Sequence, residues 1–268
     1  MRVIRTTILL IILIGSSVFA ADYMAQADSL FALRNITFND STLLAESTQI
    51  DAALELYQTA LDSAIKPEER LEAAWKILRA YYFKGTYTEA NKGKCGDIYK
   101  NGIDFSKSVL DEFPESVELH CWTGLLWGYL GEVQGILTSA RKGLAGKVKY
   151  HAEKTIKLDG TYLNGGGYRM LGTAHLKVPR IPLILGWPSK KKAVANLEKA
   201  NQISPNNLYT MYYLADAYLA TDQKDKAKKL LLQIINTDTL VHEIAVDATA
   251  RHMAQLLYYK QFEKSEDE

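Results

Sequence analysis

The chain has 268 residues, of which 47% are hydrophobic and 24% are charged. This composition is typical of a globular protein, and it excludes a disordered polyelectrolyte and a bundle of membrane helices. The formal net charge of +1 excludes the basic excess that neutralises nucleic-acid phosphates. The length allows one or two domains.

Residues 1–20 have the three parts of a secretory signal peptide. Arg2 and Arg5 form a short basic region, a run of isoleucine and leucine follows, and Val18 and Ala20 suit a cut after Ala20. The apolar run is shorter than the ~20 residues of a membrane span, so an uncleaved anchor helix is the alternative. We therefore expect an exported protein, periplasmic or secreted. Cleavage would leave 30 basic and 31 acidic residues.

The two cysteines, Cys95 and Cys121, are an even pair in a chain expected to reach an oxidising compartment. Such a pair can form a disulfide. The spacing does not show whether the two Cβ atoms face each other, so a disulfide and two free thiols both stay open. Two cysteines without a CxxC arrangement do not make a zinc site.

The segment 207–238 shows a two-helix repeat most clearly. A small residue on the first helix, Ala215, allows close approach of a second helix at Ala227, and Tyr218 and Leu231 fill the space on either side. This alternation of large, small and aromatic positions is typical of tetratricopeptide repeats. The apolar stripes are Met211, Leu214, Ala215 and Tyr218, then Ala227, Leu231 and Ile234.

Similar but looser units precede this one. One has its helices at Tyr168–His175 and Lys190–Ile203, separated by an insert at Pro179–Pro188 whose three prolines forbid a continuous helix. Further units begin near Trp122 and Trp75, and the segment 85–102 in the latter looks too glycine-rich for one clean turn. A degenerate first unit would pair Asp22–Leu33 with a helix around Tyr57.

These units predict an all-α fold: an α-α superhelix of about four to five tetratricopeptide-type helix pairs. The segment Glu243–Tyr259 reads as one amphipathic helix, which would cap the open end of the superhelix. No alternating strand pattern competes with the helices. We expect one helical domain at 21–262 and a disordered tail at 263–268, because the tail is short, charged and terminal.

Residues that could carry catalysis or hold a metal are not grouped in the sequence. The five histidines show no pair at the spacing of three or four residues that metal ligands on a helix need. The run Gly165–Gly167 lacks the strand and the lysine of a phosphate loop, so it indicates a tight helix start, with an anion site at that helix end as the alternative. We therefore predict a protein that is not an enzyme and has no cofactor or metal.

A binding groove is expected on the concave side, which the first helix of each tetratricopeptide pair lines. Counting in register places a mixture of aromatic and charged side chains there. Such a groove could hold an acidic small molecule or an extended peptide. The main candidates are His120, Trp127, Arg169, Tyr209 and Tyr212.

One segment resembles a known family. The strings Asp159–Tyr162, Gly165–Gly172 and Leu185–Ala193, together with Pro179 and Pro182, resemble the T-component proteins of tripartite ATP-independent periplasmic (TRAP) transporters. Gly166, Gly167, Arg169, Gly172 and Pro179 match the motif. Trp187 stands where the family has a glycine. The lipoprotein cysteine that is common in the family is absent from this chain.

The resemblance implies a periplasmic accessory protein that associates with a solute-binding protein and that can be a trimer. It also implies a route or holding site for small hydrophobic or carboxylated ligands. The alternative is a general tetratricopeptide scaffold that mediates protein–protein interactions in envelope assembly. Both hypotheses describe a binding protein without nucleic acid as a partner.

Overall fold

The computed structural model describes residues 20–135, 138–139, 142–180, 185–237 and 244–263. The predicted leader, apart from Ala20, lies outside these ranges, and so does the predicted tail after Glu263. Glu263 itself ends a short helical turn.

The described chain is almost entirely helical. Within these ranges no strand forms, and an isolated bridge joins Asn39 and Leu44. No helix there combines the length and the apolar character that crossing a membrane would take. A first helix covers 20–32. The next elements are η1 (Leu33–Asn35), α2 (Thr48–Ser63), α3 (Pro67–Tyr87), α4 (Lys92–Glu112), α5 (Val117–Gln134), α7 (Leu144–Asp159), α8 (Tyr162–Lys177), α9 (Lys190–Ile203), α10 (Leu208–Leu219), α11 (Lys224–Ile235), α12 (Ile244–Tyr258) and η2 (Tyr259–Glu263).

Side-chain caps set the start of several helices. Asn91 accepts hydrogen bonds from the backbone N–H groups of Gly93 and Lys94 at the start of α4, and Ser116, Ser189 and Asn207 cap α5, α9 and α10 in the same way. Each cap satisfies a backbone donor that has no partner inside the helix. A capped start fixes where a helix begins, so the turns between neighbouring helices can be short.

The segment 85–102 differs from the prediction of a long, irregular middle. It belongs to two regular helices, α3 and α4, joined by a turn at 88–91. The glycines there serve packing, because a Cβ at Gly85 would overlap the ring of Tyr99, and one at Gly102 would lie 2.8 Å from Leu126. Glycine therefore marks close helix contact in this segment and not a turn.

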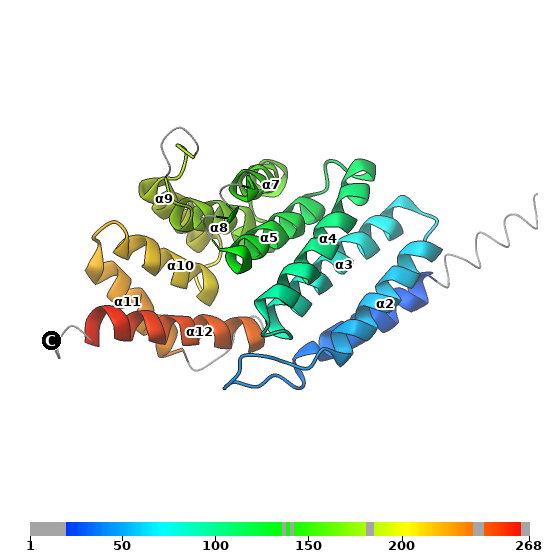
Figure 1. Cartoon of the computed structure of the whole chain (residues 1–268), viewed down its shortest axis with the longest axis horizontal. Coiled ribbons are helices and arrows are strands. Elements are labelled where there is room, and N and C mark those ends of the chain that lie inside the picture. The colour runs from blue at the N-terminus through cyan, green and yellow to red at the C-terminus, as the bar shows by residue number, and fades with distance from the viewer. Residues whose placement is uncertain (1–19, 136–137, 140–141, 181–184, 238–243, 264–268) are drawn as a thin grey trace, which may run out of the picture.

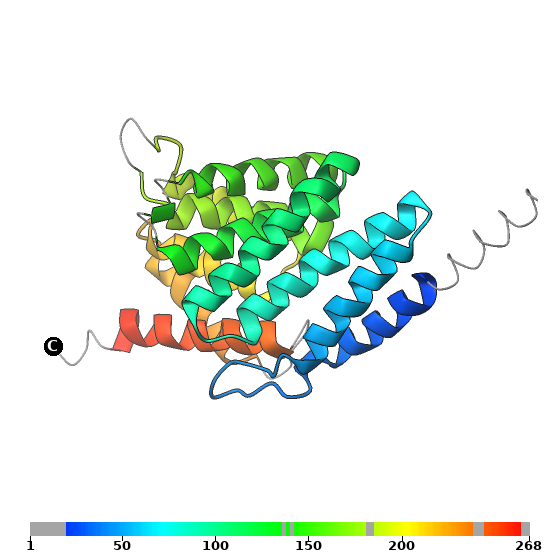
Figure 2. The ribbon, with the colours of Figure 1, turned by 45° about the vertical axis from the view of Figure 1, so that its right-hand side comes forward.

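The helices stack as antiparallel pairs into a superhelix, as predicted. The pairs are the helix 20–32 with α2, then α3 with α4, α5 with α7, α8 with α9, and α10 with α11. Consecutive helices pack on each other, and α3, α5, α8 and α10 also contact one another in order. The first helices of these pairs thus form an inner layer and the second helices an outer layer (Figures 1 and 2).

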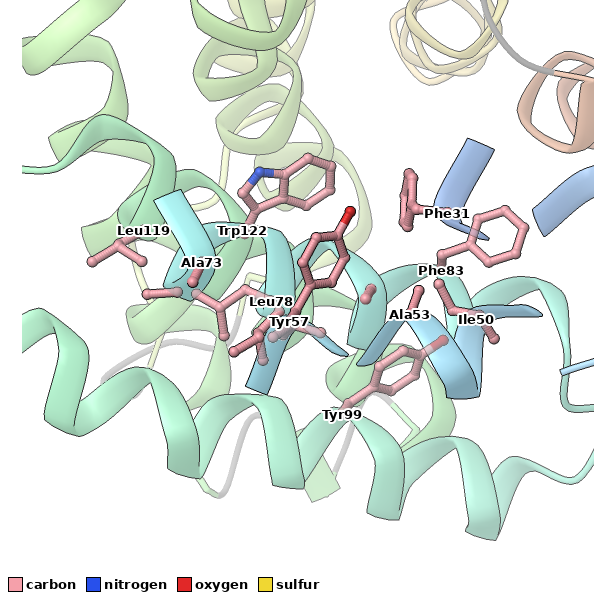
Figure 3. Close-up of a cluster of buried hydrophobic side chains, with 14 of the residues drawn as sticks. Phe31, Ile50, Ala53, Tyr57, Ala73, Leu78, Phe83, Tyr99, Leu119 and Trp122 are labelled. Atoms are coloured by element: carbon pink, nitrogen blue, oxygen red, sulfur yellow. The ribbon is translucent and has the colours of Figure 1, made fainter. Parts of the chain in front are cut away.

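The core is divided along the stack. In the N-terminal half, side chains from α2, α3, α4 and α5 converge with Phe31 in one cluster (Figure 3). A second cluster joins α9, α10, α11 and α12. A small third cluster around Cys121, Ala152 and Met170 connects the two halves.

The helix α12 caps the last pair and also reaches back to the other half. It packs on α10 and α11, yet Ala245 in its first turn is fully buried in the N-terminal cluster, and Val246 packs against the same cluster. Figure 1 shows the start of α12 (orange) approaching the lower ends of α3 and α4. The last helix therefore caps the C-terminal end and also contacts the N-terminal cluster.

The proline insert folds back over the core in the part that is described. Residues 181–184 lie outside the described ranges. Leu185 is 7% exposed, and the Trp187 ring packs edge-on against His175 with ring centroids 5.0 Å apart. The end of the insert therefore covers α8.

Candidate functional site

The inner layer encloses a cavity of about 300 Å³. Its walls come from α3, α5, α8 and α10, closed by the first turn of α7 and by Val246 of α12. A volume of this size is at the lower end of small-ligand pockets. Segments far apart in the sequence therefore build one concave site, on the side that the sequence predicted.

Glycines of α5 contribute open space to this cavity. Gly128 and Gly131 line the cavity, and a Cβ added at Gly128 would meet no atom within 4 Å. Glycine inside a helix costs about 1 kcal/mol relative to alanine. No close neighbour of Gly128 excludes a larger side chain there. The glycine is therefore not needed for helix packing, and the empty space beside it is a feature of the cavity.

Aromatic rings form the wall nearest the middle of the stack. The rings of Tyr82 and Tyr129 stand edge to face with centroids 5.2 Å apart, and Tyr82 also packs on Trp122 at 5.5 Å. The hydroxyls of Tyr82 and Tyr129 are 3.4 Å apart. Tyr209 of α10 lies near Tyr129 and Tyr87, and burial raises its pKa above the ordinary range. The wall is thus apolar with one small hydroxyl cluster.

Charged groups lie at both ends of the cavity. At one end, Lys177 forms an ion pair of 2.6 Å with Asp216. Glu132 lies near Lys177, and although water reaches its carboxyl, the surrounding protein raises its pKa, partly offset by Lys177. Toward the start of α5 the lining charges are Arg79 and Arg169. The cavity therefore carries an excess of positive groups.

Arg169 is held by oxygen atoms that carry no charge. Its guanidinium donates to the hydroxyl of Thr210 at 3.2 Å and to the main-chain carbonyls of Leu163 and Asn164 at 3.5 Å. Thr210 in turn donates to the Asn207 side chain at 2.9 Å. Arg169 thus connects the start of α8 to the start of α10 and keeps its own positive charge unneutralised by these bonds.

The start of α8 has an unusual backbone. Leu163, Asn164 and Gly165 are all left-handed, with φ of 50°, 56° and 75°. Non-glycine residues seldom adopt this conformation, and such strain is often located at ligand sites. Leu163 and Asn164 line the cavity, so the strained turn forms part of its wall.

The glycines of the motif shape the helix packing. A Cβ at Gly167 would lie 2.9 Å from Ile156 of α7, and one at Gly172 would lie 2.6 Å from Leu197 of α9. Gly166 faces the sulfur of Cys121, and all three glycines are buried. They let α8 approach both neighbours closely and do not contact the cavity, whereas Arg169 and Pro179 line it.

Three of the five predicted groove residues lie in the cavity, namely Trp127, Arg169 and Tyr209. His120 does not, because it is 3% exposed between α5 and α7 and bonds there to His151. Tyr212 does not line the cavity either, and its ring packs on Tyr213. The prediction that His120 faces the groove is wrong. Because α5 is apolar on most of its circumference, residue spacing alone does not show which face of this helix lies on the inner side.

Cys95 and Cys121 are free thiols in this structure, so the disulfide that the sequence left open is not formed. The two helices are antiparallel, and the rise of 1.5 Å per residue separates the two sites by about 20 Å along the axes, far beyond disulfide reach. Cys95 donates to the carbonyl of Glu89, and burial raises the pKa of Cys121 to about 12.

Several lining residues were missed by the sequence reasoning. Tyr82 and Trp122 were not among the groove candidates, and each packs in or against the core while also lining the cavity. Gly128 gave no signal beyond being a glycine inside an apolar helix. Among the described residues no group of three metal-binding side chains occurs.

The matches with known proteins agree with this architecture. Residues 38–182, more than half of the chain, match the model of the family "Regulator of microtubule dynamics protein 1-3". Residues 191–245 match a tetratricopeptide repeat model. The family model thus names a different family from the TRAP T-components, whose motif here consists largely of packing glycines.

Two known proteins illustrate the relationship. Regulator of microtubule dynamics protein 3 of Mus musculus is 29% identical over 144 residues, which are 54% of this chain and 29% of the mouse protein, so the chain spans less than a third of that relative's length. The crystal structure of a thermophilic TPR protein from Thermus thermophilus superposes with a TM-score of 0.58 at 16% identity, covering 88% of this chain and 99% of the other, and shows the fold. The chain is therefore a tetratricopeptide-type protein that belongs to the family of the regulator of microtubule dynamics proteins 1-3.

Proposed function

We propose that this chain is a non-catalytic interaction module that takes a segment of a partner protein into the cavity of its inner layer. Tetratricopeptide superhelices present such concave surfaces for binding. The aromatic wall offers large, rigid contact area at low entropic cost, and the arginines and Lys177 supply polar anchors.

The open space beside Gly128 in the cavity is the observation that carries this proposal. An inner helix of a closely packed stack would gain stability from a larger side chain at that position. The space beside Gly128 is empty to 4 Å and is surrounded by groups from four helices. An occupant that fills this space would explain the arrangement.

A plug in the cavity tests the proposal. Gly128→Leu directs a side chain into the cavity from a position where a Cβ would meet no atom within 4 Å, so we expect the protein to fold and to lose its partner. Gly146→Leu is the matched control, because Gly146 is an exposed helical glycine of α7 with nothing within 4 Å and lies outside the cavity lining. Affinity purification from the source cells, run in parallel, should recover a partner with the wild type and the control only.

The proposal is wrong if Gly128→Leu keeps every partner that the wild type binds. Circular dichroism and thermal unfolding of both variants would establish that they are folded. A partner lost with both variants would indicate an effect of helix stability and not of the cavity.

A role in microtubule dynamics is a narrower candidate, which the family match over 38–182 favours. The proposed activity is the one in the name of the mouse relative. Co-sedimentation of the purified chain with polymerised tubulin, and growth rates of microtubules with and without the chain, would test it. Absence of both binding and a rate change would remove this candidate.

Export through the leader and an association with a transporter's solute-binding protein stay predictions from the sequence. They rest on the pattern in 1–20 and on the motif around Gly165–Pro188. N-terminal sequencing of the native protein would show whether the chain is cut after Ala20. A solute-binding protein lost with Gly128→Leu would support the transport role, and so would adjacent permease genes.

A further inference from the structure

The cavity is electrically uneven along its length. Lys177, Glu132 and the ion-paired Asp216 lie at the end formed by the last turns of α5 and α8. Arg169 lies nearer the start of α5, because it donates to Thr210 in the first turn of α10 and to two carbonyls at the start of the neighbouring α8. The charge of Arg79 reaches Tyr162, which accepts a hydrogen bond from Trp122 near the start of α5. One end therefore has one lysine with two carboxylates, and the other has two guanidinium groups.

The two arginines differ in how far they are neutralised. Arg169 donates to three uncharged oxygens. Arg79 belongs to a balanced cluster: Asp28 lies 3.8 Å from Arg79 and 2.6 Å from Lys76, and Lys76 also pairs with Glu72 at 2.6 Å. The excess positive charge at this end is therefore that of Arg169.

Apolar side chains lie between the arginine end of the cavity and Gly128. Trp122 and Leu125 of α5 lie between the level of the arginines and Gly128. The hydroxyl of Thr173, which also lines the cavity, is buried without a partner among the described residues. A ligand that fits would place an anion at Arg169 and an apolar or aromatic group one or two residues away, against Gly128.

We propose that the occupant of the cavity is an acidic segment of a partner protein, with a carboxylate at Arg169 and an adjacent aromatic or apolar side chain against Gly128. This inference rests on the proposed function and adds the chemistry of the partner. Arginine binds carboxylates with paired hydrogen bonds in a fixed geometry. An acidic peptide therefore matches both the charge and the shape of this end.

Selection of peptides tests the inference without knowledge of the partner. A random twelve-residue peptide library displayed on phage is selected against the full chain, with Gly128→Leu as the counter-target. We expect enriched peptides to carry Asp or Glu next to an aromatic or apolar residue. Replacing that acid by its amide should weaken binding to the wild type by about ten- to hundredfold, as loss of a charged hydrogen bond does.

A double-mutant cycle separates recognition from folding, because Arg169 also holds α8 to α10. With Arg169→Gln the acidic and amide peptides should bind equally. If the variant only loosens the fold, both peptides weaken by the same factor and the preference for the acid persists, which would overturn the inference. Arg70→Gln is the control, since this half-buried arginine pairs with Glu112 outside the cavity, and it should keep the full preference.

The remaining outcomes are also decisive. Cavity-dependent peptides without acid enrichment would overturn this inference and leave the proposed function standing. No peptide that depends on Gly128 would count against both. A small apolar molecule that native mass spectrometry finds on the wild type, and not on Gly128→Leu, would replace the peptide as the occupant.

Discussion

His120 of α5 and His151 of α7 share one proton between their Nδ1 atoms, which lie 3.0 Å apart in the interior. The Nε2 of His120 is 2.9 Å from the carbonyl oxygen of Pro114, and a carbonyl only accepts, so this nitrogen carries a proton. The Nδ1 of neutral His120 is then an acceptor, and the Nδ1 of His151 donates to it. The pair joins the α4–α5 turn to α7.

Acid should destabilise the fold through this pair. Burial lowers the pKa of His151 to about 3 and also lowers that of His120, whereas the unfolded chain binds these protons near pH 6.5. The contribution to stability is therefore complete above about pH 6.5 and is lost as pH falls from there toward 3. For His151 the loss at pH 5 is about 2 kcal/mol, measured as the difference in urea unfolding between pH 7.5 and pH 5.

The variant His151→Asn checks the origin of this effect. The asparagine amide can still donate to His120 but does not titrate, so most of the difference between pH 7.5 and pH 5 should disappear. His252→Asn is the control, because His252 is exposed on α12. An unchanged pH dependence in His151→Asn would contradict the prediction.

The two cysteines should behave as buried thiols. Cys121 is fully buried and Cys95 is 6% exposed, and burial raises the pKa of both, which keeps the reactive thiolate scarce. We expect the intact mass to be the same with and without a reductant. Ellman's reagent should react slowly with the native protein and with two thiols after denaturation. A mass lower by two hydrogens before reduction would contradict this and would require a rearranged α4–α5 pair.

The fold could be predicted from sequence where local signals agree. The helix Lys190–Ile203 was predicted with the bounds it has, because Ser189 caps its start and Ser204–Pro205 follows its end. The last helix was placed within one residue at each end. Alternating small and large residues at helix spacing give the packing of such pairs, since close approach needs a small side chain on each partner.

The site could be predicted only in part, because register and glycine are ambiguous signals. Repeat position placed Trp127, Arg169 and Tyr209 on the inner layer, but His120 turned toward α7 in a helix that is apolar nearly all round. Glycine was read as a turn signal at 85–102, where it provides helix contact. Glycine also opens the cavity at Gly128, and only the neighbouring helices reveal which of these roles applies.

Two alanine substitutions should therefore have opposite effects. Gly172→Ala places a Cβ 2.6 Å from Leu197 and 3.2 Å from the carbonyl of Ala193, so we expect a loss of about 1–3 kcal/mol from overpacking. Gly128→Ala meets nothing and should gain up to about 1 kcal/mol of helix propensity. Urea unfolding of both variants measures the difference. Equal effects would mean that the close approach of α8 and α9 does not depend on Gly172.

The first turn of α12 should stabilise the N-terminal half, although it lies at the other end of the chain. Ala245 is fully buried in the N-terminal cluster, while Ala254 on the same helix is equally buried in the C-terminal cluster. Ala245→Phe should displace the start of α12 and speed amide hydrogen exchange in α3. Ala254→Phe, the same substitution at the same burial, should speed exchange in α10 and α11 and leave α3 protected. If both variants speed exchange in every helix alike, the two halves unfold as one unit, and the start of α12 does not stabilise the N-terminal half separately. If Ala245→Phe leaves α3 protected, the contact of Ala245 with the N-terminal core adds little to stability.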